Sequence, residues 1–265
     1  MKKLKAFFYV LFKSATSISY YKDLLKVPLG FSIKYLLILA VLASVIISIA
    51  IVPSTAKKQI VEIDKFTDGA IAFFPDDLVI SIKNGELTMN RTEPFIVKGI
   101  LAIDVNGTIE DLDRYETAVL INSSNIVVRE EGAIKAYPLK DMPDTQVTKD
   151  MIVGSAERID GYLKYLPYAL FALIFLVEFF YYFGMKLLYL LIVAVLVMLI
   201  GRARGLSLGF SKFYQISLHA MTLPLVIEVV TGIVGFSIGI PMWFLGLNLL
   251  VALAAIMRID TKSSS

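Results

Sequence analysis

One apolar stretch, residues 33–52, constrains the fold more than any other part of the chain. Its sequence is IKYLLILAVLASVIISIAIV, and Lys34 is its only charged residue. In a helix these residues rise about 30 Å, which matches the hydrocarbon core of a bilayer. About 30 residues precede the stretch, whereas a cleavable signal has a shorter apolar core much nearer the start. We therefore expect an uncleaved transmembrane anchor over residues 33–52.

The composition of the whole chain agrees with a membrane protein. Of the 265 residues, 57% are hydrophobic and only 18% are charged, which lies outside the usual composition of soluble globular proteins. The net charge of +3 gives no indication of a nucleic-acid partner. Cysteine is absent, which excludes disulfides, thiolate metal ligands and cysteine nucleophiles. We expect the lipid bilayer as one partner, and a protein partner that the sequence does not identify.

The segment before the anchor, residues 1–32, is basic and rich in aromatic residues. Up to Lys34 the chain has seven lysines and a single acid, Asp23. Because positive charge is retained on the cytoplasmic side of membranes, we predict a cytoplasmic N-terminus. The apolar run Ala6–Phe12 suits an amphipathic helix that lies in the headgroup plane. Packing of this run against the protein's own membrane helices is an alternative of equal weight.

Residues 53–160 have the composition of an ordinary soluble domain, with 12 basic and 19 acidic residues. The orientation of the anchor places this domain outside the cytoplasm. The dipeptide Asn84-Gly85 joins two short apolar runs and predicts a type I′ hairpin, whose central residues need positive φ. Further strands are expected at 95–105, 118–121 and 126–129, with helical segments at 60–73 and 148–165. We predict one inserted extracytoplasmic domain that is α+β or β-rich.

An α-helical transmembrane bundle is expected over residues 161–258, followed by a polar tail at 259–265. The run from Tyr165 to Ile200 is almost continuously apolar and would make a helix of about 54 Å, too long for one comfortable crossing. We therefore predict two spans that meet at a turn over 182–186, which contains Gly184. Residues 216–238 and 242–257 supply two more spans. Together with the anchor, the bundle then has about five spans.

A four-span alternative follows from the distribution of basic residues. With five spans the basic residues after the long run lie outside, whereas four spans place all of them in the cytoplasm, as the positive-inside rule prefers. These residues are Arg202, Arg204, Lys212, Arg258 and Lys262. We favour five spans because a single helix over the long run exceeds the thickness of the bilayer.

The familiar catalytic motifs are absent from the sequence. With one histidine there is no HExxH zinc site, and neither a GxxxxGK[ST] phosphate loop nor a GxSxG elbow occurs. The stretch Asp104–Glu110 lacks the full spacing of a calcium-binding loop. We predict that the protein is not an enzyme and has no cofactor and no metal site.

Polar residues at membrane depth are the best candidates for function, because burying them in hydrocarbon is costly. They are Glu178, His219, Glu228 and Asn248. We expect the two carboxylates to point into the bundle. A proton or ion relay is one interpretation of these residues, and side chains that are hydrogen-bonded locally are the other.

Two further groups of residues are candidates for packing and for lipid contact. Gly235 and Gly239 form a GxxxG pattern that allows close helix packing, although Pro241 also suggests a helix end there, and Pro224 predicts a bend. Arg202 and Arg204 are candidate contacts to lipid phosphates, or loop charges without a specific ligand.

Several short motifs occur in a fixed order along the chain. They are Phe74-Pro75-Asp76 leading to Lys83-Asn84-Gly85, Ile103-Asp104 before a glycine turn, and Tyr214 through Ser217 to Ala220, Thr222 and Pro224. These motifs resemble the bacterial membrane proteins of the domain-of-unknown-function 1189 family, over nearly the whole chain. The resemblance implies a bacterial plasma membrane, and a packing aromatic at the position of His219. The last motif is also similar to one in Yip-type five-span membrane proteins.

These observations lead to two hypotheses for function. The first is a non-enzymatic membrane scaffold or accessory subunit, whose extracytoplasmic domain binds a partner or an envelope component. The second is a transporter of a small solute, or a transport accessory protein, in which the intramembrane polar residues and broken helices take part. The resemblance adds maltodextrin as a possible connection, since some relatives are named for maltodextrin utilisation.

Overall fold

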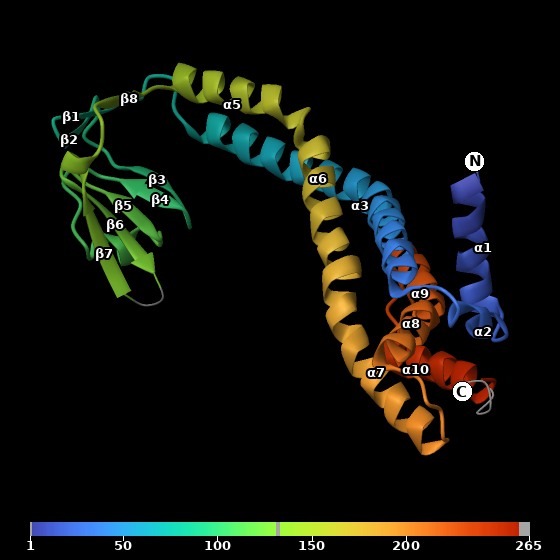
Figure 1. The fold of residues 1–265 in the computed structure, drawn as a ribbon. Coiled ribbons are helices and arrows are strands. Elements are labelled where there is room, and N and C mark those ends of the chain that lie inside the picture. The colour runs from blue at the N-terminus through green and yellow to red at the C-terminus, as the bar shows by residue number, and fades with distance from the viewer. Residues whose placement is uncertain (1, 131–132, 260–265) are drawn as a thin grey trace. The chain divides into compact units, whose positions relative to one another are not determined.

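The computed structural model describes residues 2–130 and 133–259, which fold into two compact units (Figure 1). The helical unit combines Met1–Ala56 with Leu166–Ser265, and the sheet unit contains Lys57–Tyr165. The sequence predicts a separate domain over residues 53–160, and both boundaries of the sheet unit lie within five residues of that range. The fold is therefore mostly helical, with a separate and smaller β region.

Nine helical elements make up the helical unit within the described residues. They are α1 (Lys2–Thr16), α2 (Tyr20–Leu24), the first part of α3 (Leu29–Phe73), α6 (Leu166–Phe179), the π-helical segment η2 (Phe180–Met185), α7 (Lys186–Ala203), α8 (Phe210–Ala220), α9 (Thr222–Val234) and α10 (Trp243–Met257). The helix α3 is continuous through Pro53 and ends in the sheet unit.

Three helices in the described part of the chain are long and apolar enough to cross a membrane. They are Leu29–Phe73, Leu166–Ala203 and Phe210–Val234, and α10 is a shorter apolar helix. The third is divided into α8 and α9, because Pro224 has no N–H with which to bond the carbonyl of Ala220. These lengths and compositions indicate that the protein associates with a membrane.

The turn predicted at residues 182–186 is absent from the structure. Residues 180–185 form the π-helical segment η2, and the chain continues in the same direction to Ala203. A π-helical segment changes the hydrogen-bonding pattern of a helix without reversing it. The prediction of a reversal rested on the length of the apolar run and was wrong, because the whole run forms one 38-residue helix. Lys186, at the predicted turn, is buried and paired with Glu228.

Hydrogen bonds hold three separate segments at one end of the helical unit. The ammonium group of Lys212 donates to the Val27 carbonyl at 2.8 Å, which joins the start of α8 to the segment before α3. The guanidinium group of Arg204 donates to the Ile256 carbonyl at 2.6 Å, which joins the end of α7 to the end of α10. The segment before α3, the α7–α8 connection and the end of α10 therefore share one end of this unit.

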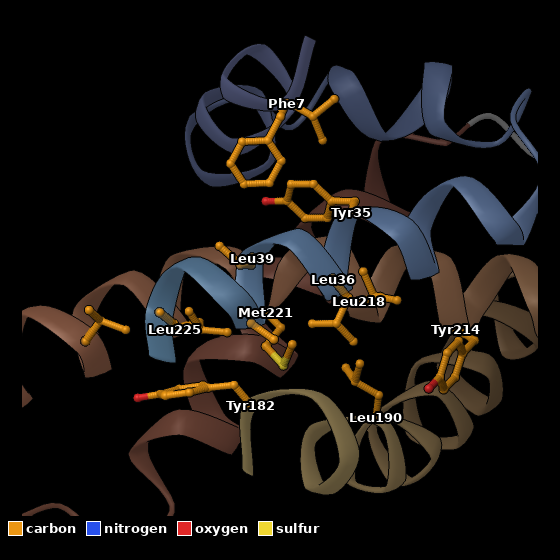
Figure 2. Close-up of a cluster of buried hydrophobic side chains, with 14 of the residues drawn as sticks. Phe7, Tyr35, Leu36, Leu39, Tyr182, Leu190, Tyr214, Leu218, Met221 and Leu225 are labelled. Atoms are coloured by element: carbon orange, nitrogen blue, oxygen red, sulfur yellow. The ribbon is translucent and has the colours of Figure 1, made fainter. Parts of the chain in front are cut away.

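The core of the helical unit gathers apolar side chains from α1, α3, η2, α7, α8 and α9. Figure 2 shows Phe7 beside Tyr35, whose ring centroids lie 5.5 Å apart. A second cluster joins α7, α8 and α10. There Gly201 allows a close approach, because a Cβ at this position would lie 2.5 Å from Cε1 of Phe213. Gly201 thus serves helix packing.

The helix α1 packs on the helical unit, as one of the two alternatives for residues 6–12 expected. Phe7 and Val10 are buried in the core, while Phe8, Tyr9 and Phe12 are exposed on the opposite face. The apolar face of α1 that is turned toward α3 and α8 therefore contacts protein. The outer face keeps the aromatic character that suits a membrane interface.

The described part of the sheet unit contains two sheets, two α-helices besides the end of α3, and the short 3-10 helix η1 (Leu139–Asp141). An antiparallel sheet has the order β2-β1-β8, and a mixed sheet has the order β3-β4-β5-β6-β7 with a parallel β4–β5 pair. The elements are β1 (Ile80–Lys83), β2 (Glu86–Met89), β3 (Phe95–Val97), β4 (Leu101–Ile103), α4 (Asp111–Arg114), β5 (Val119–Ile121), β6 (Asn125–Glu130), β7 (Ala133–Pro138), β8 (Thr145–Val147) and α5 (Lys149–Leu163).

The strand predictions agree with the sheets in part. The run at 95–105 is not one strand, because Gly99 has a φ of +77° and the chain turns there into the antiparallel pair β3–β4. The strand β7 was missed because all six of its residues are exposed, so it has no apolar alternation. The strand β8 has only three residues. The helical segments expected at 60–73 and 148–165 correspond to the end of α3 and to α5.

The Asn84-Gly85 hairpin is confirmed, although Gly85 at its tip is covered. β1 and β2 are antiparallel and Lys83 pairs with Glu86, while Asn84 and Gly85 have φ values of +51° and +78°. These values are those of a type I′ turn. Asn84 is exposed, but Gly85 is buried against Lys140, whose Cα would lie 2.5 Å from an added Cβ.

A valine at position 85 should destabilise the β1–β2 hairpin more than a valine at position 99. Both glycines have positive φ, which costs an L-residue about 1 to 2 kcal/mol, but the space around Gly99 is open. We expect Gly99→Val to cost about that amount and Gly85→Val distinctly more. Hydrogen exchange of the full chain, read by mass spectrometry on peptides spanning residues 78–90 and 95–103, measures both effects. Equal losses of protection in the two variants would contradict the close contact between Gly85 and Lys140.

Candidate functional site in the helical unit

An ion pair lies among the apolar helices of the helical unit. The ammonium nitrogen of Lys186 lies 2.9 Å from Oε2 of Glu228 and 3.3 Å from Oε1. The Tyr181 hydroxyl donates to Oε1 of Glu228 at 2.7 Å and accepts from Lys186 at 3.2 Å. Only 7% of the Lys186 side chain and 22% of the Glu228 side chain are exposed. The three polar groups thus satisfy one another in a largely apolar setting.

The π-helical segment η2 explains how Tyr181 and Lys186 reach the same carboxylate. A π-helix bonds residues five apart, so it brings positions 181 and 186 toward one face of the helix. Glu228 comes from α9, and Phe244 of α10 covers the lysine, with Nζ 3.4 Å from the ring centroid. A cation over an aromatic face is attracted to it, which further stabilises the buried charge.

This arrangement has two chemical capacities. An ammonium, a carboxylate and a phenol within hydrogen-bond distance can stabilise a buried charge, and they can also pass a proton between them. The sequence pointed to Glu228 but missed Tyr181, Lys186 and Phe244 as its partners. The sequence did contain an indication of this pair, because Lys186 lies in the middle of one apolar run and Glu228 lies in the next.

Glu178 does not join this ion pair. It lies in α6, is half-buried and makes no hydrogen bond or ion pair among the described residues. Of the two predicted carboxylates, only Glu228 pairs with Lys186 of α7. That Glu178 points into the bundle stays a prediction.

His219 is the centre of a second polar network, which joins α1, α3 and α8. Its Nδ1 atom is hydrogen-bonded to the Ser14 hydroxyl at 2.9 Å, and its Nε2 atom to the Ser32 hydroxyl at 3.1 Å. The ring stacks on Tyr35 with centroids 4.7 Å apart, and Gln215 also bonds Ser32. His219 is fully buried. These contacts agree with the locally hydrogen-bonded interpretation of His219, and its stacking on Tyr35 resembles that of a packing aromatic.

Asn248 is buried on α10 and approaches the ion pair through aromatic side chains. Its amide nitrogen donates to the Tyr189 hydroxyl at 3.4 Å, and the Tyr189 ring meets Phe244 edge-to-face. The amide oxygen of Asn248 has no hydrogen-bond partner among the described residues.

Gly235 and Gly239 do not pack against another helix among the described residues. Gly235 ends α9 in the left-handed conformation with a φ of +71°, and no described atom lies within 4 Å of a Cβ at either position. The GxxxG pattern therefore coincides with a helix end, which is the alternative that Pro241 suggested. Pro224 is buried in the first turn of α9, and Pro241 precedes Met242 at the start of α10.

The two arginines proposed as lipid contacts differ in their surroundings. Arg204 donates to the carbonyls of Ile256 and Met257 at the end of α10, where a cation complements the helix dipole. Arg202 is exposed in the last turn of α7. The structure thus gives Arg204 a protein partner, and lipid contact stays a prediction for Arg202.

The described residues contain no group of three or more His, Asp or Glu side chains that could hold a metal ion. In the sheet unit, Asp104 accepts a hydrogen bond from the Tyr115 hydroxyl at 2.7 Å and another from the backbone of Asn106. The first bond raises the pKa of Tyr115 to about 12. Asp104 therefore stabilises its own turn.

The sheet unit also contains an apolar pocket, which the sequence did not predict. Its volume is about 450 Å³, within the usual range for ligand sites. The end of α3, both sheets and the start of α5 line it. Phe66, Phe73 and Ile100 are large lining side chains that remain more than half exposed.

A family model described as "Protein of unknown function (DUF1189)" matches residues 8–259. The chain belongs to this family. The match runs from α1 to just beyond α10 and so includes both units, which confirms the resemblance inferred from the sequence motifs. A search of curated proteins gave no match, and a search of solved structures gave none either.

Removing one member of the ion pair should destabilise the helical unit far more than removing both. Lys186→Met leaves Glu228 charged and without its cation, and such a loss costs about 3 to 5 kcal/mol. The double variant Lys186→Met with Glu228→Leu should recover most of that stability. Unfolding in lipid nanodiscs can be followed by the fluorescence of Trp243, the single tryptophan, which neighbours Phe244.

The exposed pair of Lys26 and Asp23 provides the matched control, because more than 70% of each side chain is exposed. Lys26→Met should change the stability by less than about 1 kcal/mol. If the double variant at positions 186 and 228 is no more stable than the single variants, Lys186 and Glu228 do not compensate each other's charge.

Proposed function

We propose that this chain is a multi-pass accessory or scaffold protein of the bacterial plasma membrane, whose sheet unit lies outside the cytoplasm and binds a partner or an envelope component. The apolar pocket in the sheet unit is the observation that supports binding most directly. Large exposed apolar side chains gathered at a pocket are typical of interaction sites. The catalytic motifs of common hydrolases and nucleotide-binding enzymes are absent from the sequence.

We propose four membrane crossings, the alternative that the sequence left open, with both termini in the cytoplasm. The crossings are α3, α6 with α7, α8 with α9, and α10. The bonds from Lys212 to Val27 and from Arg204 to Ile256 support one common side for these segments. That side then carries the N-terminal lysines and the later basic residues, in agreement with the positive-inside rule. The helix α10 alone rises about 22 Å, so the apolar residues before it complete the fourth crossing.

A crosslinker placed at the pocket should capture the partner in native membranes. Phe73 lines the pocket with 66% of its surface exposed, and Tyr137 on β7 is 48% exposed and lies outside the lining. Replacing each in turn with p-benzoylphenylalanine changes an aromatic to a larger aromatic. We expect adducts of defined mass from position 73 and none from position 137. Equal adducts at both positions, or none at position 73, would count against the binding role.

Ion-coupled transport of a small solute is a second candidate, favoured by the buried ion pair in the helical unit. A carboxylate that is held by Lys186 and Tyr181 can exchange its partners when a proton or cation arrives. Such groups commonly mark substrate and ion pathways in transporters.

Under this second candidate, the reconstituted protein should move protons when a suitable solute is added. A panel of small solutes that includes maltodextrins tests this in liposomes with a trapped pH dye. Glu228→Gln should abolish the flux, whereas Asp23→Asn, which changes an exposed carboxylate, should leave it unchanged. If the unsubstituted protein gives no flux with any solute, the ion pair has a structural role only.

A further inference from the structure

The pocket of the sheet unit offers a ligand almost no hydrogen bonds. It has 17 lining residues, and all but Lys65 are apolar residues or glycine. A sugar or a peptide backbone would lose its water in such a pocket without regaining hydrogen bonds, which is unfavourable. A hydrocarbon group loses nothing on entry and gains contacts. The lining therefore selects an apolar group.

The apolar surface continues from this pocket along α3 and α5. A second pocket of about 240 Å³ shares Phe66, Ala70, Val147 and Ile152 with the first. The two hydroxyl groups on its lining, those of Thr67 and Ser155, already donate to backbone carbonyls of their own helices. The shared lining makes one elongated apolar tract, which fits a linear chain better than a compact ring system.

Lys65 gives this tract a single positive charge. It is exposed, it lines the larger pocket, and it has no ion-pair partner among the described residues. The neighbouring acids Asp64 and Asp68 lie on the same helix but not on the pocket lining. An ammonium group beside an apolar pocket complements an anionic headgroup attached to an apolar chain.

We propose that the sheet unit binds a single-chain anionic amphiphile of the fatty-acid class. The alkyl chain occupies the pocket between the two sheets and the end of α3, and the carboxylate pairs with Lys65. This inference rests on the binding role proposed for the sheet unit and names its ligand. Binding of the chain covers Phe66 and Phe73, which are otherwise exposed.

Photolabelling of the full chain in phosphatidylcholine nanodiscs tests this proposal. The probe is a palmitic acid that carries a diazirine near the middle of its chain, and the matched probe is the corresponding uncharged alcohol. Mass spectrometry of the digested protein locates the labels. We expect the acid to label peptides within residues 61–74 and 95–103, and the alcohol to label them at least several-fold less.

Three substitutions separate a site from simple partition into lipid. Gly69→Phe fills the pocket from α3, where an added Cβ meets no described atom within 4 Å, and should reduce labelling about tenfold. Gly154→Phe is the matched control, since Gly154 has the same open space on α5 but does not line either pocket. Lys65→Gln, at an exposed position, should reduce labelling by the acid and leave labelling by the alcohol unchanged.

Several results would overturn the proposal. Labels confined to the apolar helix at 166–203 and insensitive to Gly69→Phe would mean partition into the bilayer. Equal labelling by acid and alcohol would remove the anionic headgroup from the ligand class. If position 73 captures a protein or a second copy of this chain in native membranes while the acid probe gives no label at residues 61–74, the binding role stands and the fatty-acid ligand is wrong.

Discussion

The arrangement of the helical unit depends on the ion pair between Lys186 and Glu228. A lysine in the middle of a 38-residue apolar helix is tolerated only if its charge is compensated there. Glu228, Tyr181 and Phe244 supply that compensation from α9, η2 and α10. The chain therefore runs from Leu166 to Ala203 without reversing.

The two units differ in the side chains that lack partners within the described residues. In the helical unit, most polar side chains of the core are bonded to one another, as in the networks of His219 and Lys186. In the sheet unit, no described residue covers the aromatic side chains that are exposed at the apolar pocket. Bonded networks stabilise a fold, whereas exposed apolar surface at a pocket indicates binding. For this reason we propose that ligand binding belongs to the sheet unit.

Features that depend on neighbouring residues could be predicted from the sequence. The Asn84-Gly85 turn and the anchor over 33–52 follow from local conformation and hydropathy. The partner of Lys186 could not be predicted, because Glu228 lies 42 residues away and apolar helices of this kind can pair in several ways. The pocket was also missed, since α3, both sheets and α5 contribute to it and no local pattern connects them.

In the proposed topology the sheet unit lies outside the cytoplasm and the α7–α8 connection lies inside. Cysteine labelling tests it directly, because the chain has no native thiols. Thr92 in the sheet unit and Ser207 after α7 are both exposed, and each can be replaced by a single cysteine. A membrane-impermeant maleimide should label Thr92→Cys in intact cells, and Ser207→Cys only after the cells are broken open. Labelling of Ser207→Cys in intact cells, or protection of Thr92→Cys, would contradict the account.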